Sequence, residues 1–174
     1  DNICAHNICS FCLKLSFLYC IISLRKTFLN RDFTHKSEDF KHMEKIFLIP
    51  PSDMSDKLPF RLTLAGITCP DADYKIYREC SELYVIEYVE KGGGTVICGG
   101  ESYRIEKGDV YILPAGFEHR YYSDKKEPWK KKWMNVSGEL CERLTEIYGI
   151  DKRVHFPKTD IGGLFDELFD YLSK

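Results

Sequence analysis

The sequence lacks a large charge of either sign, because 25 lysine and arginine residues stand against 27 aspartate and glutamate residues, a formal net charge of −2. A domain that binds nucleic acid by itself normally carries a basic excess, so we expect this chain not to bind DNA on its own. An apolar run of about 20 residues, the length of a membrane-spanning helix, is also missing. The nearest candidate, Leu15–Leu24, has only ten residues and is flanked by Lys14 and Arg25.

A zinc-knuckle motif is a further absence. Four of the eight cysteines fall within the first 20 residues, with Cys9 and Cys12 spaced as CxxC, but no second His/Cys pair at zinc-ligand spacing follows them. We expect the other four to be free, reduced thiols in a cytoplasmic protein. These four are Cys69, Cys80, Cys98 and Cys141.

Residues 1–42 contain neither glycine nor proline, and the chain begins with Asp1 rather than methionine. No small-residue cleavage site follows the apolar run, which argues against a signal peptide. We interpret residues 1–42 as a non-native or upstream-translated extension that is poorly ordered, with Met43 as the natural start. A membrane anchor is the alternative for this segment.

What is present from Met43 onward is a series of short strand patterns separated by turns. Apolar residues make up 44% of the chain and aromatic residues 14%, which is typical of a globular protein with a substantial core. The two-residue turn Gly99-Gly100 predicts a hairpin. Other strands are predicted at 61–68, 74–78, 83–89, 110–113, 119–123 and 131–137, a pattern that favours a β-sandwich or barrel.

The pattern becomes helical after Gly138. Apolar residues recur at helical spacing over 140–148 and again over 161–172, and Asp160 is placed to cap the second helix. The apolar stripe of the second helix is wide for a helix at the end of a chain. It must pack on the barrel, on the first helix or on another subunit.

Residues Gly108–Ser123, "GDVYILPAGFEHRYYS", resemble the second conserved motif of the cupin superfamily. Gly108, Pro114 and Gly116 supply its turns and His119 its histidine, whereas Ser123 stands where the motif has asparagine. The stretch "YVEKGGGTV" resembles the end of the first cupin motif.

A more specific resemblance covers about 58–174, through "ELYVIEYVEKGGGTV", "KGDVYILPAGFEHRYYSD", "EPWKKKWMNVSG" and the trailing helices. These motifs, in this order, resemble the N-terminal effector-binding domain of AraC-family transcription regulators. The resemblance implies a mainly β, cupin-type double-stranded β-helix (jelly-roll) barrel at 43–137 with an N-terminal arm. A helical dimerisation and linker segment follows at 138–174. In that family a helix-turn-helix domain comes next, so DNA binding is expected only through a domain absent from this chain.

The metal ligands of cupins are largely missing. The position of the family's glutamate falls on Val85, and the window for its His-x-His pair, "RECSE", has no histidine. Cys80 and Glu82 are the substitutes that the window offers, but His119 alone does not make a site. We therefore expect no metal, no cofactor and no metal-dependent enzyme.

Strand alternation predicts which side chains share the barrel interior with His119. Tyr121 follows on the same strand, and Lys131, Trp133 and Asn135 share one face of the next, with the resemblance placing the tryptophan inward. The vacant metal position at Val85 puts Glu87 inward, and Arg78 occupies the position of an arginine that contacts sugar in the arabinose-binding member. The predicted ligand-binding set is Arg78, Glu87, His119, Tyr121 and Trp133.

This set suits a polyhydroxylated ring, because a tryptophan face stacks on the sugar while polar groups bind its hydroxyls. An ion pair or hydrogen bond between Glu87 and Arg78 would avoid an unpaired buried charge. In the alternative interpretation, His119 only ties the turn together and Trp133 fills the core. Trp129 is expected on the outside of its loop, and Lys125, Lys126 and Lys130–Lys132 are expected to be solvated.

The resemblance implies an effector-sensing and dimerisation domain of a transcription regulator, and not an enzyme. One expected partner is a small-molecule effector, which would be a carbohydrate. The other is a second copy of the chain, bound through Leu164, Phe165, Leu168 and Leu172, together with Phe169. In that family the segment before the barrel can fold over the pocket, so the resemblance implies this role for the arm at 43–58, with Phe47 or Ile49 at the pocket mouth. The alternatives are a metal-independent sugar isomerase or epimerase, with His119 as base and Tyr121 as acid, and a purely structural dimer module.

Overall fold

A computed structural model describes residues 43–49, 58–149 and 152–173, so the extension at 1–42 lies outside the described residues. The strands are β1 (Met43–Leu48), β2 (Arg61–Cys69), β3 (Lys75–Arg78), β4 (Tyr84–Lys91), β5 (Gly93–Cys98), β6 (Glu101–Glu106), β7 (Val110–Leu113), β8 (His119–Ser123), β9 (Lys130–Ser137) and β10 (His155–Phe156). The helices are α2 (Glu139–Ile147) and α3 (Gly162–Leu172). Neither helix is long or apolar enough to span a membrane.

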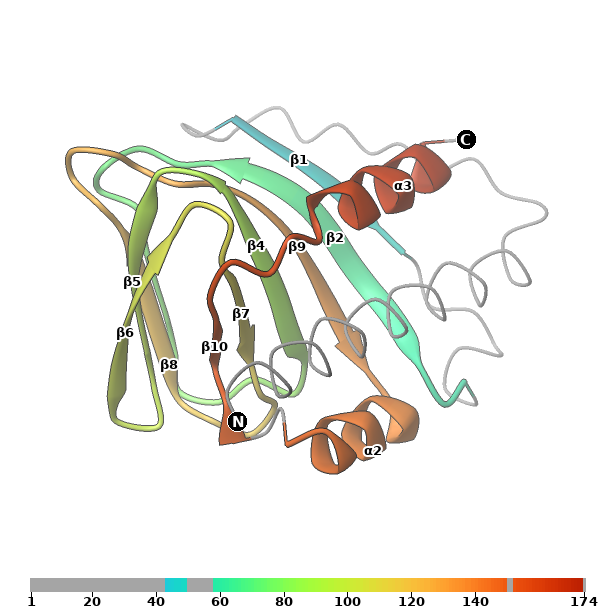
Figure 1. The fold of residues 1–174 in the computed structure, drawn as a ribbon. Coiled ribbons are helices and arrows are strands. Elements are labelled where there is room, and N and C mark those ends of the chain that lie inside the picture. Colours follow the sequence, from blue (N-terminus) through green and yellow to red (C-terminus); the bar gives the residue numbers. More distant parts are fainter. Residues whose placement is uncertain (1–42, 50–57, 150–151, 174) are drawn as a thin grey trace.

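The strands form two sheets that face each other (Figure 1). The larger sheet has the order β1-β2-β9-β4-β7-β10, and the smaller sheet has the order β3-β8-β5-β6. The described pairs of named strands are all antiparallel. The prediction of a mainly β jelly-roll barrel followed by two helices is confirmed.

The β5–β6 hairpin turns at the two predicted glycines. Gly99 and Gly100 have φ values of 59° and 82°, and a left-handed pair of this kind matches the twist of the flanking strands. Cys98 pairs with Glu101 directly across this turn. The glycine pair therefore fixes the register of the hairpin.

The larger sheet is buried on both faces. Val85, Val89 and Tyr111 on its inner face pack against Val96 and Tyr121 of the smaller sheet, so one core fills the barrel. The outer face forms a second core with the helices. From the sheet this core takes Leu62, Ala65, Ile86, Val110, Ile112, Met134 and Val136.

Helix α3 covers the outer face of the larger sheet with the apolar stripe that the sequence singled out as a dimer seam (Figure 1). Phe165 and Leu168 have no exposed surface, and Phe169 is also buried. Their packing partners lie in the same chain, so Phe165 and Leu168 form part of its own core. Leu164 and Leu172 are half-buried at the edge of this core, and the dimer seam of Leu164, Phe165, Leu168 and Leu172 stays a prediction.

Strand β1 also packs on this outer face. The Phe47 ring stacks on the Phe169 ring with centroids 5.3 Å apart and planes 12° apart. Phe47 lies opposite Ala65 of β2, whose side chain belongs to the same outer core. Phe47 therefore faces α3 rather than the barrel interior, and Ile49 packs against this outer core as well.

Strand β10, which the sequence did not predict, fastens the segment before α3 to the barrel. The buried Asp109 carboxylate accepts hydrogen bonds from Lys158 N and Glu106 N, both at 3.0 Å, and lies 2.9 Å from His155 Nε2. Burial alone would raise the pKa of Asp109, but the hydrogen bonds from Lys158 and His155 lower it below its ordinary value. The ionised carboxylate thus holds three segments together.

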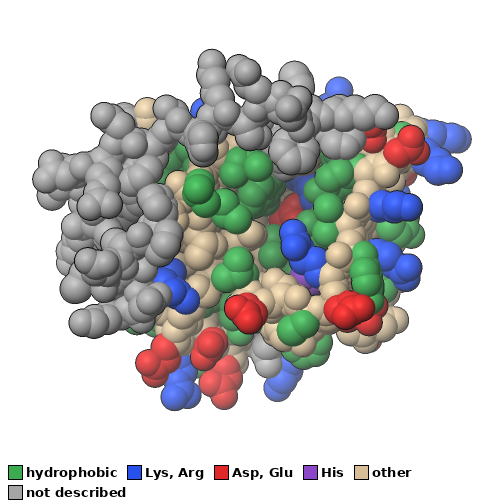
Figure 2. Space-filling model, turned by 180° about the vertical axis from the view of Figure 1, so that it is seen from behind, with side chains coloured by type: hydrophobic (Ala, Val, Ile, Leu, Met, Phe, Trp, Pro, Cys, Tyr) green, Lys and Arg blue, Asp and Glu red, His purple; other side chains and the backbone are tan. Residues whose placement is uncertain are grey.

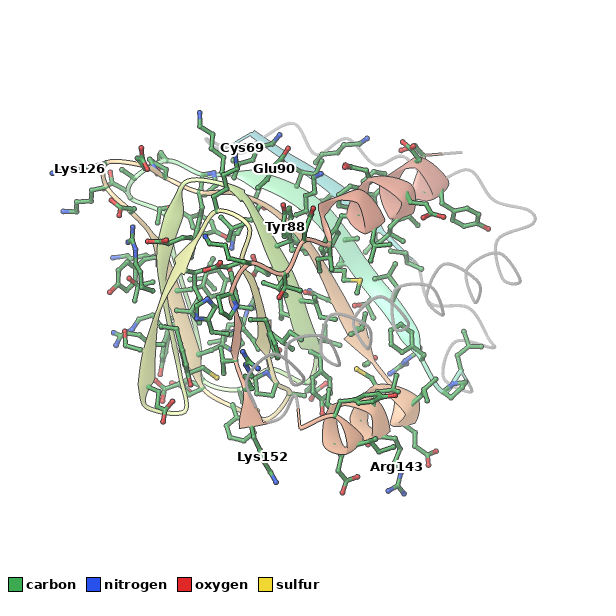
Figure 3. All side chains as sticks on the ribbon, in the orientation of Figure 1. Cys69, Tyr88, Glu90, Lys126, Arg143 and Lys152 are labelled. Carbon is green, nitrogen blue, oxygen red and sulfur yellow. The ribbon has the colours of Figure 1, made fainter. Side chains whose placement is uncertain are left out.

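Tyr88 of β4 packs beside the start of α3. Figure 3 shows Tyr88 on the side of the sheet where the chain runs into that helix. A Cβ at position 162 would lie 2.8 Å from the Tyr88 ring, so the glycine there permits the close approach. Asp160, the predicted cap, accepts a 3.2 Å hydrogen bond from Gly162 N at the first turn.

Candidate functional site

A buried ion pair lies between the two sheets. Lys131 Nζ of β9 is 2.6 Å from Glu87 Oε2 of β4, and these side chains are only 1% and 2% exposed. The ammonium also donates a 3.1 Å hydrogen bond to the Tyr111 hydroxyl. Because Glu87 is paired with Lys131, the predicted partnership of Glu87 with Arg78 is wrong.

Aromatic rings surround the Lys131 ammonium. Its Nζ lies 4.2 Å from the Tyr121 centroid, and such contacts with ring faces stabilise a desolvated cation. The other rings are Trp129 at 4.8 Å, Tyr74 at 5.1 Å and Tyr111 at 5.8 Å. Glu87 and these four rings, which we call the Lys131 cage, fill the interior next to the start of β9.

Two sequence expectations fail at the Lys131 cage. Trp129 is 1% exposed and stacks on Tyr111 inside the barrel, rather than packing outside its loop. Lys131 and Lys132 are buried rather than solvated, because β9 lies between β2 and β4 in the interior of the sheet. Strand alternation did place Lys131 on the inward face, which is the signal that identifies it as part of the site.

His119 begins β8 directly after the Pro114–Gly116 turn, as predicted. Its side chain is 1% exposed, and its ring stacks on Tyr121 with centroids 6.1 Å apart. Neither Nδ1 nor Nε2 makes a hydrogen bond of good geometry with a described residue, although an interaction with the Phe117 backbone partly opposes the fall of the His119 pKa. Burial, together with the positive charge of Arg78, lowers the pKa of His119 below its ordinary value of 6.5.

We expect the stability of the chain to fall as the pH drops below the ordinary histidine pKa of about 6.5. The unfolded chain binds a proton there that folded His119 resists, so stability is fully present above this pH and is lost below it. Urea unfolding at neutral and mildly acidic pH measures the slope, which should be smaller for His119→Gln. Equal slopes for wild type and variant would contradict the lowered pKa.

Arg78 and Trp133 complete the predicted set. Arg78 of β3 lies directly opposite His119 in the β3–β8 pair, is exposed, and makes no ion pair with any described residue. Trp133 is half-buried opposite Glu87, and its Nε1 donates a 2.7 Å hydrogen bond to Thr68 Oγ1. A Cβ at Gly66 would lie 2.8 Å from Trp133 Cζ2, so this glycine makes room for the indole.

All five predicted residues lie on strands that line the barrel interior, and four of them form two cross-strand pairs on opposite sheets. Arg78 opposes His119 on the smaller sheet and Glu87 opposes Trp133 on the larger one. Tyr121, buried between them, contacts both His119 and the Lys131 cage. Figure 2 shows a hollow in the molecular face that contains basic, acidic and histidine side chains between hydrophobic groups.

The chemistry of the site is that of hydrogen bonding and charge recognition. Among the described residues, no three His, Cys, Asp or Glu side chains are grouped so that they could hold a metal ion. The neutral imidazole offers one donor and one acceptor, and the guanidinium offers a fork of donors. The four described cysteines are free thiols and lie outside this set.

The model of the AraC-like ligand binding domain matches residues 63–173. The chain belongs to this family. The match spans the barrel from β2 onward and both helices, so the site lies within the AraC-like domain.

Curated relatives of this AraC-like chain are regulators of operons. The Msm operon regulatory protein of Streptococcus mutans is 24% identical over 59% of this chain and 37% of its own length. The raffinose operon regulator RafR of Pediococcus pentosaceus is 38% identical over 33% of this chain and 21% of its own length. The lactose operon transcription activator of Staphylococcus xylosus is 33% identical over 40% and 25% of the two chains. The chain thus spans well under half the length of these relatives.

Solved structures resemble the AraC-like domain at low sequence identity. A Cupin 2 conserved barrel domain protein from Salinispora arenicola is 15% identical, with a TM-score of 0.44, over 68% of this chain and 99% of that one.

Proposed function

We propose that this AraC-like domain senses a small, sugar-like effector that binds between the two sheets, for a cytoplasmic transcription regulator. The family and its operon-regulating relatives support the sensing role. The words raffinose and lactose in the names of two relatives support a carbohydrate. DNA binding and homodimerisation through the helical segment are proposals for the whole regulator.

The observation that carries this proposal is the state of His119. A buried polar group without a hydrogen-bond partner is costly and rare, and ligand-binding sites are one place where it occurs. Both ring nitrogens of His119 are in this state, with Arg78 beside the ring. A bound hydroxyl or carbonyl oxygen would satisfy one of these nitrogens.

Two neighbouring lysines of strand β9 connect the barrel interior with α3. Lys131 points into the barrel and pairs with Glu87. Lys132, the next residue, points outward, and its Nζ lies 2.6 Å from Asp166 Oδ1 of α3. A ligand that shifts β9 would therefore change contacts on both faces of the sheet. This arrangement supports a sensor, in which the ligand must bind one arrangement better than another.

The alternative of a sugar isomerase gains no support from Tyr121. Burial, and next the charge of Glu87, raise the pKa of Tyr121 well above its ordinary value. A tyrosine of this kind is a weaker proton donor than usual, which makes it a poor general acid. Turnover of a sugar phosphate by the purified chain would contradict this conclusion.

A thermal-shift screen of the 174-residue chain against mono- and disaccharides and sugar acids tests the proposal. A ligand at 100 times its dissociation constant should stabilise the chain by about 2.7 kcal/mol. Trp133→Ala and Arg78→Ala should abolish the shift, because they remove a stacking face and a donor fork. Tyr77→Ala is the control, since this β3 side chain is 54% exposed and points away from the barrel. A shift retained in both site variants would place the ligand elsewhere.

A further inference from the structure

We propose that the effector carries an anionic group, a carboxylate or a phosphate, that binds between Arg78 and His119. This inference rests on the proposed sensing function and names the chemical class of its ligand. It follows from the balance of charges inside the barrel. Arg78 is a cation on the inward face of β3 that has no ion-pair partner within the described part of the chain.

The Glu87 and Lys131 charges cancel each other. Their 2.6 Å contact, the hydrogen bond to Tyr111 and the surrounding rings occupy the ammonium, and both side chains are almost completely buried. A ligand therefore meets no net charge from this pair. Because the Lys131 cage occupies the interior around Tyr111 and Trp129, the proposed ligand lies on the side of Arg78 and His119.

The charge that remains at the site is the guanidinium of Arg78. Glu79 and Glu82 are its nearest acidic neighbours in sequence, and Glu118 precedes the opposing His119, but none of the three forms an ion pair with it among the described residues. His119 adds no charge, because its imidazole is buried beside this cation. The site is thus positive, with the ring nitrogens of the buried His119 opposite Arg78 in the β3–β8 pair.

A carboxylate or phosphate matches both groups at once. Its oxygens accept hydrogen bonds from the Arg78 fork and from the imidazole N–H, and such charge-assisted hydrogen bonds are the stronger kind. The hydroxyls of a neutral sugar also accept hydrogen bonds from Arg78, but they place no opposite charge beside the guanidinium. With Trp133 as a stacking face on the opposite sheet, the ligand class is a sugar acid or a sugar phosphate.

Calorimetric titration of the 174-residue chain with matched pairs of an anionic and a neutral sugar tests whether the effector is an anion. The pairs are galacturonate with galactose, gluconate with glucose, and glucose 6-phosphate with glucose. We expect at least one anionic member to bind about tenfold or more tighter than its neutral partner, as a charge-assisted hydrogen bond implies. Preference for the sugar acids identifies the group as a carboxylate, and preference for the 6-phosphate identifies a phosphate.

Two arginine variants locate the anion. Arg78→Gln should bring the two affinities of a pair close together, whereas Arg120→Gln should leave their ratio unchanged. Arg120 is the matched control because it is an exposed arginine of β8 that faces away from the barrel, opposite Tyr77. An unchanged melting temperature for both variants would show that the loss is one of binding rather than folding.

The outcomes separate this inference from the function on which it rests. Neutral sugars that bind as tightly as their acids would overturn the anionic class and leave the sensing function in place. An anion preference that survives Arg78→Gln would overturn the site. Binding of no member of any pair would overturn the anionic class and the proposed sugar-sensing function together.

Discussion

We expect Leu168→Asp to prevent stable folding of this chain rather than to produce a folded monomer. Leu168 has no exposed surface and packs with Phe165 and the outer face of the larger sheet. Truncating a buried leucine to alanine alone costs about 2–5 kcal/mol, and a carboxylate adds the cost of an unpaired buried charge. The sum approaches the total stability of a typical domain, about 5–15 kcal/mol.

Circular dichroism with urea unfolding and size-exclusion chromatography measures this outcome. Glu167→Ala is the control, because the neighbouring Glu167 is exposed on the same helix and its loss should leave folding intact. A wild-type dimer that Leu168→Asp converts into a stable monomer would instead show that the stripe joins two chains. The single-chain packing of α3 would then be wrong.

The strands could be predicted because short strands carry their signals locally. Val110–Leu113 and His119–Ser123 were bounded correctly, since glycine and proline turns enclose them. The Gly99-Gly100 turn specified its hairpin for the same reason. Strand β10 escaped prediction because two residues show no periodicity, and its position depends on Asp109, 46 residues earlier in the chain than His155.

The sequence predicts which side chains of the candidate site face the barrel interior, but it does not predict which of them pair with one another. Alternation along a strand places Glu87 and Lys131 inward, but it does not say which cation lies beside which carboxylate. The pairing follows from the β4–β9 register, in which Glu87 opposes Trp133. Lys131 is then the diagonal neighbour of Glu87 on the adjacent strand, within reach of a long side chain. Arg78 belongs to the other sheet and opposes His119 instead.

The apolar stripe of α3 has the same ambiguity. Helical periodicity shows that 161–172 bury one face, but a face that packs on a sheet of the same chain has the same pattern as one that packs on a partner. The decision lies in contacts that are distant in sequence, such as the stacking of Phe47 on Phe169. Those contacts depend on where β1 joins the sheet, which its own six residues do not reveal.

Breaking the buried ion pair from one side should destabilise the chain strongly, whereas removing both charges should not. Glu87→Leu and Lys131→Met each leave one uncompensated charge in the Lys131 cage, and such single changes cost about 3–5 kcal/mol. The double variant replaces both charges with apolar side chains and should regain most of this loss. Urea unfolding of the four proteins gives the coupling energy.

The pair of Lys130 with Glu90 is the control for this cycle. It has a similar separation, 2.9 Å, but its side chains are 40% and 36% exposed. Exposed pairs contribute about 0–1 kcal/mol, so Lys130→Met should have little effect although it removes the same type of side chain from the neighbouring position. If Lys131→Met costs no more than Lys130→Met, the rings and Glu87 do not hold a desolvated ammonium. The charge balance that leaves Arg78 as the unpartnered cation would then fail as well.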